Sequence, residues 1–427
     1  MGICIPKQTY ETENFANSNI TQFEGTYINK QKNGYCIEFS KEGYIIYEGQ
    51  WINDRKEGLC KLYHNKILIY EGQFINNMKH GHGVEYIEHN KYYEGDWVNN
   101  NKTGYGTLYY QKYIDIIFYT GYFLNNKKHG RGSLFYHTNN IKLSGVWEND
   151  LLLSGTEYWQ NKNIKYEGAF KDDKYFGDST IYLENGNIHY IGTFLQGYKY
   201  GYGKEYDNNN NILYEGYYIY NMKTGYGETF INNKLFYSGY WYNNKKEGKG
   251  RLYYDNIKYN GEFVNDQYEG YGELYINNYL YYKGTFKYGL KHGKGTIYSN
   301  LLEYYIGDFY NDSKEGTGTI FFSNTHKVQY KGKLINDMRH GYGIIYFNNG
   351  IKCYKGEWCN NMSHGYGEEY NSKGTLLYKG NWYYNNKSTK SVNYNNKSTK
   401  SVNYNNKSTK SVDYNNKSTK SVDYNNI

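Results

Sequence analysis

Aromatic residues and glycines alternate along this chain in a pattern that recurs at a nearly fixed spacing. Residues 93–97 (Tyr-Glu-Gly-Asp-Trp) have close variants at residues 47–51, 70–74 and 354–358. With the central glycine counted as position 0, sixteen copies follow one another 22 to 26 residues apart. Self-similarity at such a period indicates a repeat architecture rather than two or three ordinary domains. The marker glycines are Gly25, Gly49, Gly72, Gly95, Gly121, Gly145, Gly168, Gly192, Gly216, Gly239, Gly261, Gly284, Gly307, Gly332, Gly356 and Gly380.

Four further positions have a nearly constant residue type. Positions −2 and +2 are each aromatic in fifteen of sixteen copies, with Leu143 and Leu334 as the exceptions. Position +9 is glycine in fourteen of the fifteen complete copies, with Ser154 as the exception. Position +14 is aromatic in all fifteen, including Trp159 in the copy at Gly145. The pattern predicts a seventeen-residue core without insertions, and it assigns all length variation to the connectors.

The spacing within each copy predicts a β-hairpin. Alternation at −2, 0 and +2 is the period of a strand with both rings on one face. A polar stretch follows, such as residues 99–103, and then a second short run, such as residues 104–109. Asn is suited to the intervening turn because it tolerates the left-handed backbone region. Register fixes the spacing inside a hairpin, whereas connectors between hairpins are free to vary.

Position +11 accepts only small residues. It is glycine in eleven copies and Cys36, Cys60, Thr156 or Ser179 in the other four. Glycine weakens a strand unless another group approaches its backbone closely. A limit on size, rather than a special φ angle, explains why Cys, Ser and Thr substitute for it. We expect an aromatic ring to lie flat over this position, from the same hairpin or from the next one.

These features predict an all-β fold, an elongated twisted ribbon or solenoid of tandem antiparallel β-hairpins. One hairpin is marginally stable, but stacked hairpins bury one another's rings. Two strands per copy give a rise of about 10 Å and a ribbon on the order of 150 Å long. The expected segments are residues 1–22 at the N-terminus, sixteen repeats over 23–382 (fifteen complete and one half) and a low-complexity tail over 383–427.

Composition supports local aromatic packing over one large aliphatic core. The chain has 61 Tyr, 49 Gly and 1 Pro, and hydrophobic residues make up only 38%. The five cysteines form no CxxC pair, which favours a reducing compartment. No apolar run approaches the roughly 18 residues of a membrane span, and no signal-peptide core is present. We therefore expect a cytoplasmic protein that is not secreted and has no transmembrane helix.

The net charge of +8 is concentrated in the C-terminal tail. Residues 387–427 hold eight lysines and two acids, which leaves a net charge of only +2 for residues 1–386. Nucleic acid is therefore not an expected partner. The tail repeats the decapeptide YNNKSTKSVN or YNNKSTKSVD, and this polar composition predicts disorder. Its lysines either attract anionic lipid or form an inert tail of variable length.

The pattern Y-E-G-x-W-x-N-N-x-x-H-G-x-G resembles that of MORN (membrane occupation and recognition nexus) repeats. Residues 70–83 and 354–367 match it nearly position for position, and the resemblance covers residues 23–382. The copy at Gly145 departs most, with Leu143, Ser154 and Thr156, so we expect irregular stacking near residues 143–160. The glycines assigned as structural repeat residues are Gly72, Gly81, Gly83, Gly95, Gly104, Gly106, Gly356, Gly365 and Gly367.

The resemblance implies an elongated antiparallel β assembly that organises membrane–cytoskeleton junctions, cell-division structures or cilia. It also implies dimerisation through terminal repeats and, as attributed to some relatives, lipid binding. In some relatives the repeats precede a phosphoinositide kinase or a methyltransferase domain, and no such domain is expected after these repeats.

No catalytic, metal or cofactor site is expected. Gly-x-Gly is frequent, but no helix follows it to bind phosphate, and no nucleophile–base set is visible. His80 and His82 form the one close histidine pair, and a structural role is favoured over zinc binding. Five histidines occupy position +8 and are therefore repeat residues rather than a cluster: His80, His129, His292, His340 and His364.

Two rows of residues are candidates for contact with partners. The side chains at position +10 form either an exposed binding ladder or rings that simply cover the sheet. This position is Tyr in seven copies: Tyr35, Tyr105, Tyr202, Tyr226, Tyr271, Tyr342 and Tyr366. Position −1 changes along the chain, from Glu24, Glu48, Glu71, Glu94, Glu167 and Glu215 to Lys283, Lys331, Lys355 and Lys379. This change would allow two chains to pair as an antiparallel homodimer, but compositional drift is the favoured explanation.

The first residues suggest a lipid anchor. Gly2 followed by Cys4 resembles a myristoylation and palmitoylation signal, although Pro6 stands where Ser or Thr is usual. Two acyl chains would hold a membrane stably, whereas one would hold it only reversibly.

The favoured hypothesis is a non-enzymatic scaffold, peripheral at the inner face of a membrane or on the cytoskeleton. Its partners would be proteins that bind along the extended ribbon. The alternatives are a phospholipid- or phosphoinositide-binding module and a regulatory arm of a phosphoinositide kinase. The nearly neutral repeat body disfavours direct binding of lipid headgroups.

Overall fold

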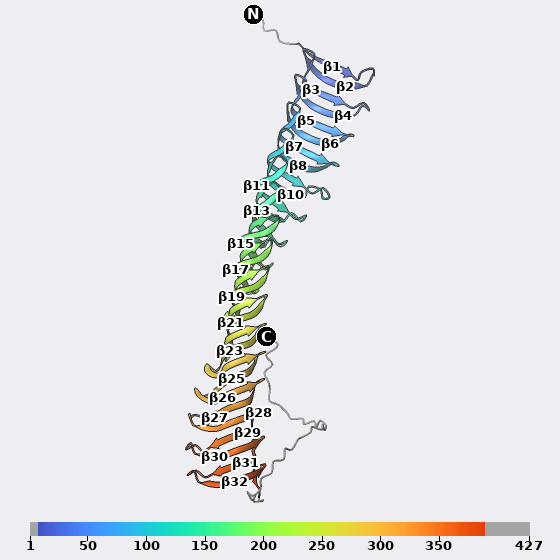
Figure 1. Cartoon of the computed structure of the whole chain (residues 1–427). Helices are drawn as coiled ribbons and strands as arrows, with labels where there is room; N and C mark the ends of the chain where they lie inside the picture. The colour runs from blue at the N-terminus through green and yellow to red at the C-terminus, as the bar shows by residue number, and fades with distance from the viewer. Residues whose placement is uncertain (1–6, 389–427) are drawn as a thin grey trace, which may run out of the picture.

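The chain folds into one long, open, antiparallel β-sheet. The computed structural model describes residues 7–388, which contain 33 strands and no helix. Each strand pairs with the next one in sequence, so the first and last strands lie at opposite ends of the ribbon (Figure 1). The strands are seen broadside near both ends and edge-on in the middle, which shows that the ribbon twists along its length. The expected all-β ribbon of tandem hairpins is confirmed.

The strands are mostly eight to ten residues long. They are β1 (Gln8–Asn14), β2 (Thr21–Ile28), β3 (Gln31–Phe39), β4 (Ile45–Ile52), β5 (Arg55–His64), β6 (Ile67–Ile75), β7 (Met78–Ile87), β8 (Asn90–Val98), β9 (Asn101–Tyr109), β10 (Ile117–Leu124), β11 (Lys127–Phe135), β12 (Ile141–Glu148), β13 (Leu151–Tyr158), β14 (Ile164–Lys171), β15 (Lys174–Tyr182), β16 (Ile188–Leu195), β17 (Tyr198–Tyr206), β18 (Ile212–Ile219), β19 (Met222–Ile231), β20 (Lys234–Tyr242), β21 (Lys245–Tyr254), β22 (Ile257–Val264), β23 (Gln267–Ile276), β24 (Tyr279–Lys287), β25 (Leu290–Ser299), β26 (Leu302–Tyr310), β27 (Ser313–Phe321), β28 (Val328–Ile335), β29 (Met338–Tyr346), β30 (Lys352–Cys359), β31 (Met362–Tyr370), β32 (Leu376–Tyr383) and β33 (Asn386–Lys387).

Small residues form a line across the strands. The marker Gly72 pairs with Gly83 at position +11 of the same hairpin, and Gly83 pairs in turn with the next marker, Gly95. The same register recurs along the ribbon. It places positions 0 and +11 of successive hairpins side by side, and we call this row the glycine line.

A tyrosine ring at position −2 covers the glycine line in most hairpins, whereas this position is Phe23 in the first copy and Leu143 in the copy at Gly145. A Cβ atom added to Gly83 would lie 2.6 Å from Cζ of Tyr70, which is at position −2 of the same hairpin. The covering ring therefore comes from the same hairpin, and the size limit at position +11 is confirmed. Position +9 is glycine for another reason, because all fourteen of these glycines have φ between +60° and +107°.

The core is a single file of aromatic rings on one face of the sheet, which we call the ring face. Tyr70 meets Phe74 of its own hairpin and Trp97 of the next, with ring centroids 5.6 Å apart in each case. Tyr93 continues the file to Trp97 and Phe123. These edge-to-face contacts are favourable for aromatic quadrupoles. The hydroxyl of Tyr70 donates to the carbonyl oxygen of Gln73 at 3.2 Å, so the buried phenol has a partner.

A row of cations lies over these rings. Position +7 is Lys or Arg in twelve of sixteen copies, and each of the twelve lies 3.3 to 6.0 Å from the centroid of the ring at position −2 of its hairpin. In the hairpin of Gly168 the residue is Tyr175, which stacks on Tyr166 with centroids 3.7 Å apart. The cations are Lys32, Lys56, Lys79, Lys102, Lys128, Lys199, Lys223, Lys246, Lys291, Lys314, Arg339 and Lys387.

Most turns are also bound to the preceding repeat. Asn76 and Asn77 have φ angles of 51° and 67°, as a two-residue type I′ turn requires. The backbone N–H of Lys56 donates to Oδ1 of Asn77 at 2.8 Å, and the N–H of Asn77 donates to the carbonyl oxygen of Lys56 at 3.1 Å. We call this pair of hydrogen bonds, from position +5 to position +7 of the preceding repeat, the inter-repeat clamp. Its Asn or Asp residues are Asp54, Asn77, Asn100, Asn126, Asp150, Asn221, Asn244, Asp266, Asp312, Asp337, Asn361 and Asn385.

Substitution of Asn100 tests the clamp. Asn100→Gly removes the acceptor for the Lys79 N–H but tolerates the φ of 67°, so we expect a loss of about 1 kcal/mol in the free energy of unfolding. Asn100→Ala should cost about 1 kcal/mol more, because alanine is strained in the left-handed region. Gly197 occupies this position naturally and keeps only the backbone bond, to Tyr175. Urea unfolding measures both variants, and a parent-like Asn100→Gly would show that the side-chain bond does not stabilise the stack.

The repeat at Gly145 is one residue short. Gly145 pairs with Gly155 at position +10, and Leu143 pairs with Glu157. Thr156 was expected at the small position of the glycine line, but Gly155 occupies it, and Tyr158 rather than Trp159 ends strand β13. The expected seventeen-residue core is therefore wrong for this copy. In the other copies the left-handed glycine of position +9 lies in a β-bulge of the second strand, as in the hairpin of Gly72. That glycine is missing here and the bulge is one residue shorter, which confirms the irregularity expected near residues 143–160.

Paired strands continue to Lys387. In the sixteenth copy Trp382 pairs with Lys387 and Tyr383 pairs with Asn386 across a turn at Tyr384 and Asn385. The clamp is present as well, since the Ser363 N–H donates to Oδ1 of Asn385 at 2.8 Å. The hairpin pattern thus extends five residues beyond residue 382. The predicted disorder of the tail concerns residues that lie almost entirely outside the described range.

Candidate interaction surface

The side of the sheet opposite the ring face is exposed, and we call it the open face. Strand alternation places the neighbours of each marker glycine on it. Position −1 pairs with +12, as in Glu94 and Thr107, and position +10 pairs with +1 of the next hairpin, as in Tyr105 and Tyr122. We call positions −1 and +12 the charge row and positions +1 and +10 the tyrosine row. The backbone of the glycine line runs between the two rows.

All seven tyrosines at position +10 are exposed, but they do not form one continuous ladder. Tyr202 and Tyr226 lie in adjacent hairpins, as do Tyr342 and Tyr366. Elsewhere residues such as Leu59 interrupt the series. The exposed fractions are 49% for Tyr35, 53% for Tyr105, 47% for Tyr202, 46% for Tyr226, 53% for Tyr271, 55% for Tyr342 and 39% for Tyr366.

Further tyrosines at position +1 join this row. The rings of Tyr105 and Tyr122 have centroids 5.7 Å apart, and Tyr217 and Tyr240 similarly adjoin Tyr202 and Tyr226. These residues were not predicted from the sequence. The signal for them was present, because position +1 lies opposite +10 once the hairpin register is fixed.

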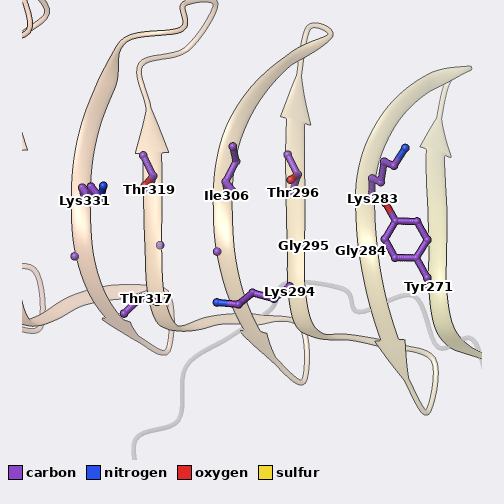
Figure 2. Close-up of a pocket in the computed structure, with 13 residues that line it drawn as sticks. Tyr271, Lys283, Gly284, Lys294, Gly295, Thr296, Ile306, Thr317, Thr319 and Lys331 are labelled. Carbon is purple, nitrogen blue, oxygen red and sulfur yellow. The ribbon is translucent and has the colours of Figure 1, made fainter.

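A shallow groove runs over the open face from β23 to β28 (Figure 2). Its volume is about 540 Å³, and its floor is the backbone of the glycine line. Lys283, Thr296, Ile306, Thr319 and Lys331 of the charge row line one side. On the other side the tyrosine row contributes Tyr271, Lys294 and Thr317. The hydroxyls and ammonium groups suit contact with an extended polar chain rather than enclosure of a small molecule.

Carboxylates within the chain neutralise part of the groove's positive charge. Lys283 Nζ lies 3.0 Å from Glu273 Oε1, and this hydrogen bond raises the pKa of Lys283. Lys294 Nζ lies 2.5 Å from Asp308 Oδ1. Burial opposes ionisation of Asp308, but its bonds to Lys294 and Thr317 outweigh burial and lower its pKa. Lys331 has no ion pair within residues 7–388, so it carries the uncompensated charge of the groove.

The acidic end of the charge row is also partly neutralised within the chain. Lys61 lies between Glu48 and Glu71, at 4.0 and 3.9 Å, and Lys91 lies 3.0 Å from Glu94. The change from glutamate to lysine along the ribbon is present on one face as expected. Antiparallel pairing of two chains through it stays a prediction.

Five of the histidines and two of the cysteines in residues 7–388 occupy recurring positions of the repeat. The Nδ1 atoms of the five histidines at position +8 are buried without a hydrogen-bond partner. Residues 7–388 contain no group of three or more His, Cys, Asp or Glu that could hold a metal ion. Cys60 lies at a small position of the glycine line, and burial raises the pKa of its thiol to about 12. Gly2 and Cys4, the candidate acylation sites, lie outside the described residues.

Over residues 7–388, no helix could cross a membrane. No curated protein matches the chain. Solved structures similar to it include the TcdB2-TccC3-TEV protein (7% identity, TM-score 0.12) and the Photorhabdus luminescens Tc holotoxin pore (8% identity, TM-score 0.12). In each case the alignment covers 88% of this chain and 23% of that chain, so this chain spans under a quarter of either. TM-scores this low do not establish a shared fold.

The family comparison concerns the repeats themselves. The MORN repeat model matches eleven segments that together make up more than half of the chain. Residues 142–213, which include the shortened repeat, are not among them. The matched segments are residues 47–65, 70–87, 93–113, 119–141, 214–232, 237–256, 259–280, 282–300, 305–326, 330–352 and 354–376. Together with the hairpin register and the rings over the glycine line, these matches show that the chain belongs to the MORN-repeat family.

Proposed function

We propose that this protein is a scaffold that binds other proteins along its open face at a membrane or cytoskeletal structure. MORN repeats in general form repeat scaffolds or membrane-associated modules and are generally non-catalytic. The observation that supports binding on the open face is the difference between the two sides of the sheet. The ring face buries its aromatic side chains under cations, whereas the open face exposes tyrosines in successive hairpins. Exposed aromatic rows on a rigid sheet are typical of protein interfaces.

Direct lipid binding is the alternative function. The groove from β23 to β28 is the most basic candidate, but two of its lysines are paired with Glu273 and Asp308. The cations of position +7 lie on aromatic rings of the other face. Open-face cations without an ion pair in residues 7–388, such as Arg131 and Lys249, are offset by open-face acids without one, such as Asp178. The open face therefore offers little net positive charge, and this favours proteins over anionic headgroups as ligands. A regulatory arm of a phosphoinositide kinase would also act through protein contacts on this face.

Proximity labelling in the native cell tests the scaffold function. The test variant changes Tyr105, Tyr202, Tyr226 and Tyr342 to Ser, which leaves the ring face intact. The control variant changes Tyr310 and Tyr383 to Ser. These two tyrosines are at least as exposed as the test tyrosines but lie outside the tyrosine row. Removal of a tyrosine that anchors an interface costs about 2 kcal/mol or more, so we expect labelling of the neighbours to fall by about tenfold or more in the test variant alone.

Two results would contradict the proposal. One is a test variant that labels the same neighbours as the parent. The other is strong sedimentation of the full chain with phosphoinositide vesicles that depends on Lys331 and not on the tyrosines. That second result would establish the lipid-binding alternative.

A further inference from the structure

The longest uninterrupted part of the tyrosine row in the described chain lies on β17 to β20. Tyr202 pairs with Tyr217, and Tyr226 pairs with Tyr240. Tyr217 and Tyr226 adjoin the paired glycines Gly216 and Gly227 on the same side of the glycine line. Four consecutive strands therefore each contribute one tyrosine to a single line, and the four side chains are 46% to 53% exposed.

Neighbouring side chains fix the orientation of these rings. The Tyr202 hydroxyl donates to Glu215 of the charge row, and this bond, together with partial burial, raises the pKa of Tyr202 to about 12. The Tyr226 hydroxyl lies 2.8 Å from Ser238 Oγ and 3.2 Å from Glu228 Oε1. The rings of Tyr202 and Tyr217 meet edge to face at 5.5 Å, and those of Tyr226 and Tyr240 at 5.9 Å. The rings are thus held in place without a ligand, which lowers the entropic cost of binding one.

The spacing of the rings selects the shape of a ligand. Strands lie about 4.8 Å apart, so equivalent tyrosines of adjacent hairpins, such as Tyr202 and Tyr226, are separated by about 10 Å. A polyproline II helix has three residues per turn and a rise of about 3.1 Å per residue, which gives a repeat of about 9 Å. A proline at every third residue of such a helix would meet every second strand of the sheet.

We propose that the row Tyr202–Tyr217–Tyr226–Tyr240 binds a proline-rich segment of a partner protein in the polyproline II conformation, lying across the strands. This inference rests on the proposed scaffold function and names the chemistry of one partner. Aromatic-lined surfaces bind such segments because the ligand is already extended and rigid in solution. Addition of a β-strand would need a free sheet edge, which the middle of this ribbon lacks.

The surrounding charges distinguish this ligand from other occupants. Glu215 and Glu228 border the row, so an acidic peptide or an anionic lipid surface is disfavoured. Glu215 is paired with Lys204 at 3.0 Å, whereas Glu228 has no ion pair within residues 7–388. A basic residue beside the prolines would find its counter-charge at Glu228.

Fluorescence anisotropy of the full chain with fluorescein-labelled decaproline tests the proposal. We expect saturable binding by the parent and none with a glycine–serine peptide of equal length. Tyr202→Ala combined with Tyr226→Ala should raise Kd at least about tenfold, because stacking on each ring is lost. Tyr105→Ala combined with Tyr122→Ala removes another exposed pair of the tyrosine row, where the row is shorter, and should leave Kd within about twofold. Circular dichroism checks that each double variant keeps its sheet.

Three outcomes would overturn the inference. They are no binding of decaproline by the parent, equal loss of binding in both double variants, and self-association of the parent that only the Tyr202 and Tyr226 variant abolishes. The third outcome, measured by sedimentation velocity, would make a second copy of this chain the occupant of the row. Failure here while neighbour labelling still depends on the open-face tyrosines would refute the proline-rich ligand and leave the scaffold function standing.

Discussion

Tyr93→Ala is expected to lower the free energy of unfolding by about 4 kcal/mol, the typical cost of removing a large buried aromatic ring. Tyr93 is fully buried, meets Trp97 and Phe123 edge to face and covers Gly106 of the glycine line. Its removal leaves a gap in a single file of rings that has no second layer to collapse into it. Urea unfolding followed by tryptophan fluorescence measures the loss, with Trp97 as a local reporter.

Two controls separate the ring from its hydroxyl and from the open face. Tyr93→Phe removes only the hydrogen bond to the carbonyl oxygen of Asp96 at 3.1 Å and should cost about 1 kcal/mol. Tyr105→Ala removes an exposed ring from the other face and should cost about 0.5 kcal/mol. Equal losses for Tyr93→Ala and Tyr105→Ala would contradict the assignment of the core to the ring face.

Gly227→Val is expected to cost about 3 kcal/mol through overpacking under a fixed ring. A Cβ atom at this position would lie 2.6 Å from Cζ of Tyr214, and a branched side chain adds two more carbons there. Gly227→Ser should cost only about 1 kcal/mol, because Ser179 occupies the equivalent position and its Oγ lies 2.7 Å from the Tyr166 hydroxyl. Thermal and urea melts measure both variants. If the two melted alike, contact between ring and backbone would not be what limits this position.

The hairpin, its turn and the small position could be predicted from sequence because each depends on residues of one copy at a fixed spacing. The ring over position +11 could be placed only once the register was known, since position −2 of the same or of the next hairpin satisfied the pattern equally. The inter-repeat clamp was missed because it joins Asn77 to the backbone of Lys56, across a connector whose length varies. The short repeat at Gly145 was misaligned because Thr156 is also small.

The candidate surface was predicted in part. Alternation along the second strand placed Tyr202 and Tyr226 opposite the buried rings, and both are exposed. Their neighbours Tyr217 and Tyr240 were not identified, because position +1 varies between copies and gains meaning only from cross-strand pairing. The cations of position +7 were also overlooked. They matter for function because Lys79 and its equivalents lie over rings and are therefore unavailable to partners on the open face.

The inter-repeat clamp also determines how the length of the ribbon depends on the number of repeats. Each clamp, like each ring contact, reaches only from one hairpin to the next, so no interaction in the repeats depends on how many hairpins there are. The length of the ribbon can therefore change only in steps of one whole hairpin. Insertion or deletion of one complete unit, such as residues 70–92, would move the far end by about 10 Å and rotate it by one increment of sheet twist. Two partners bound to different hairpins are held at a separation and an angle that the repeat number sets.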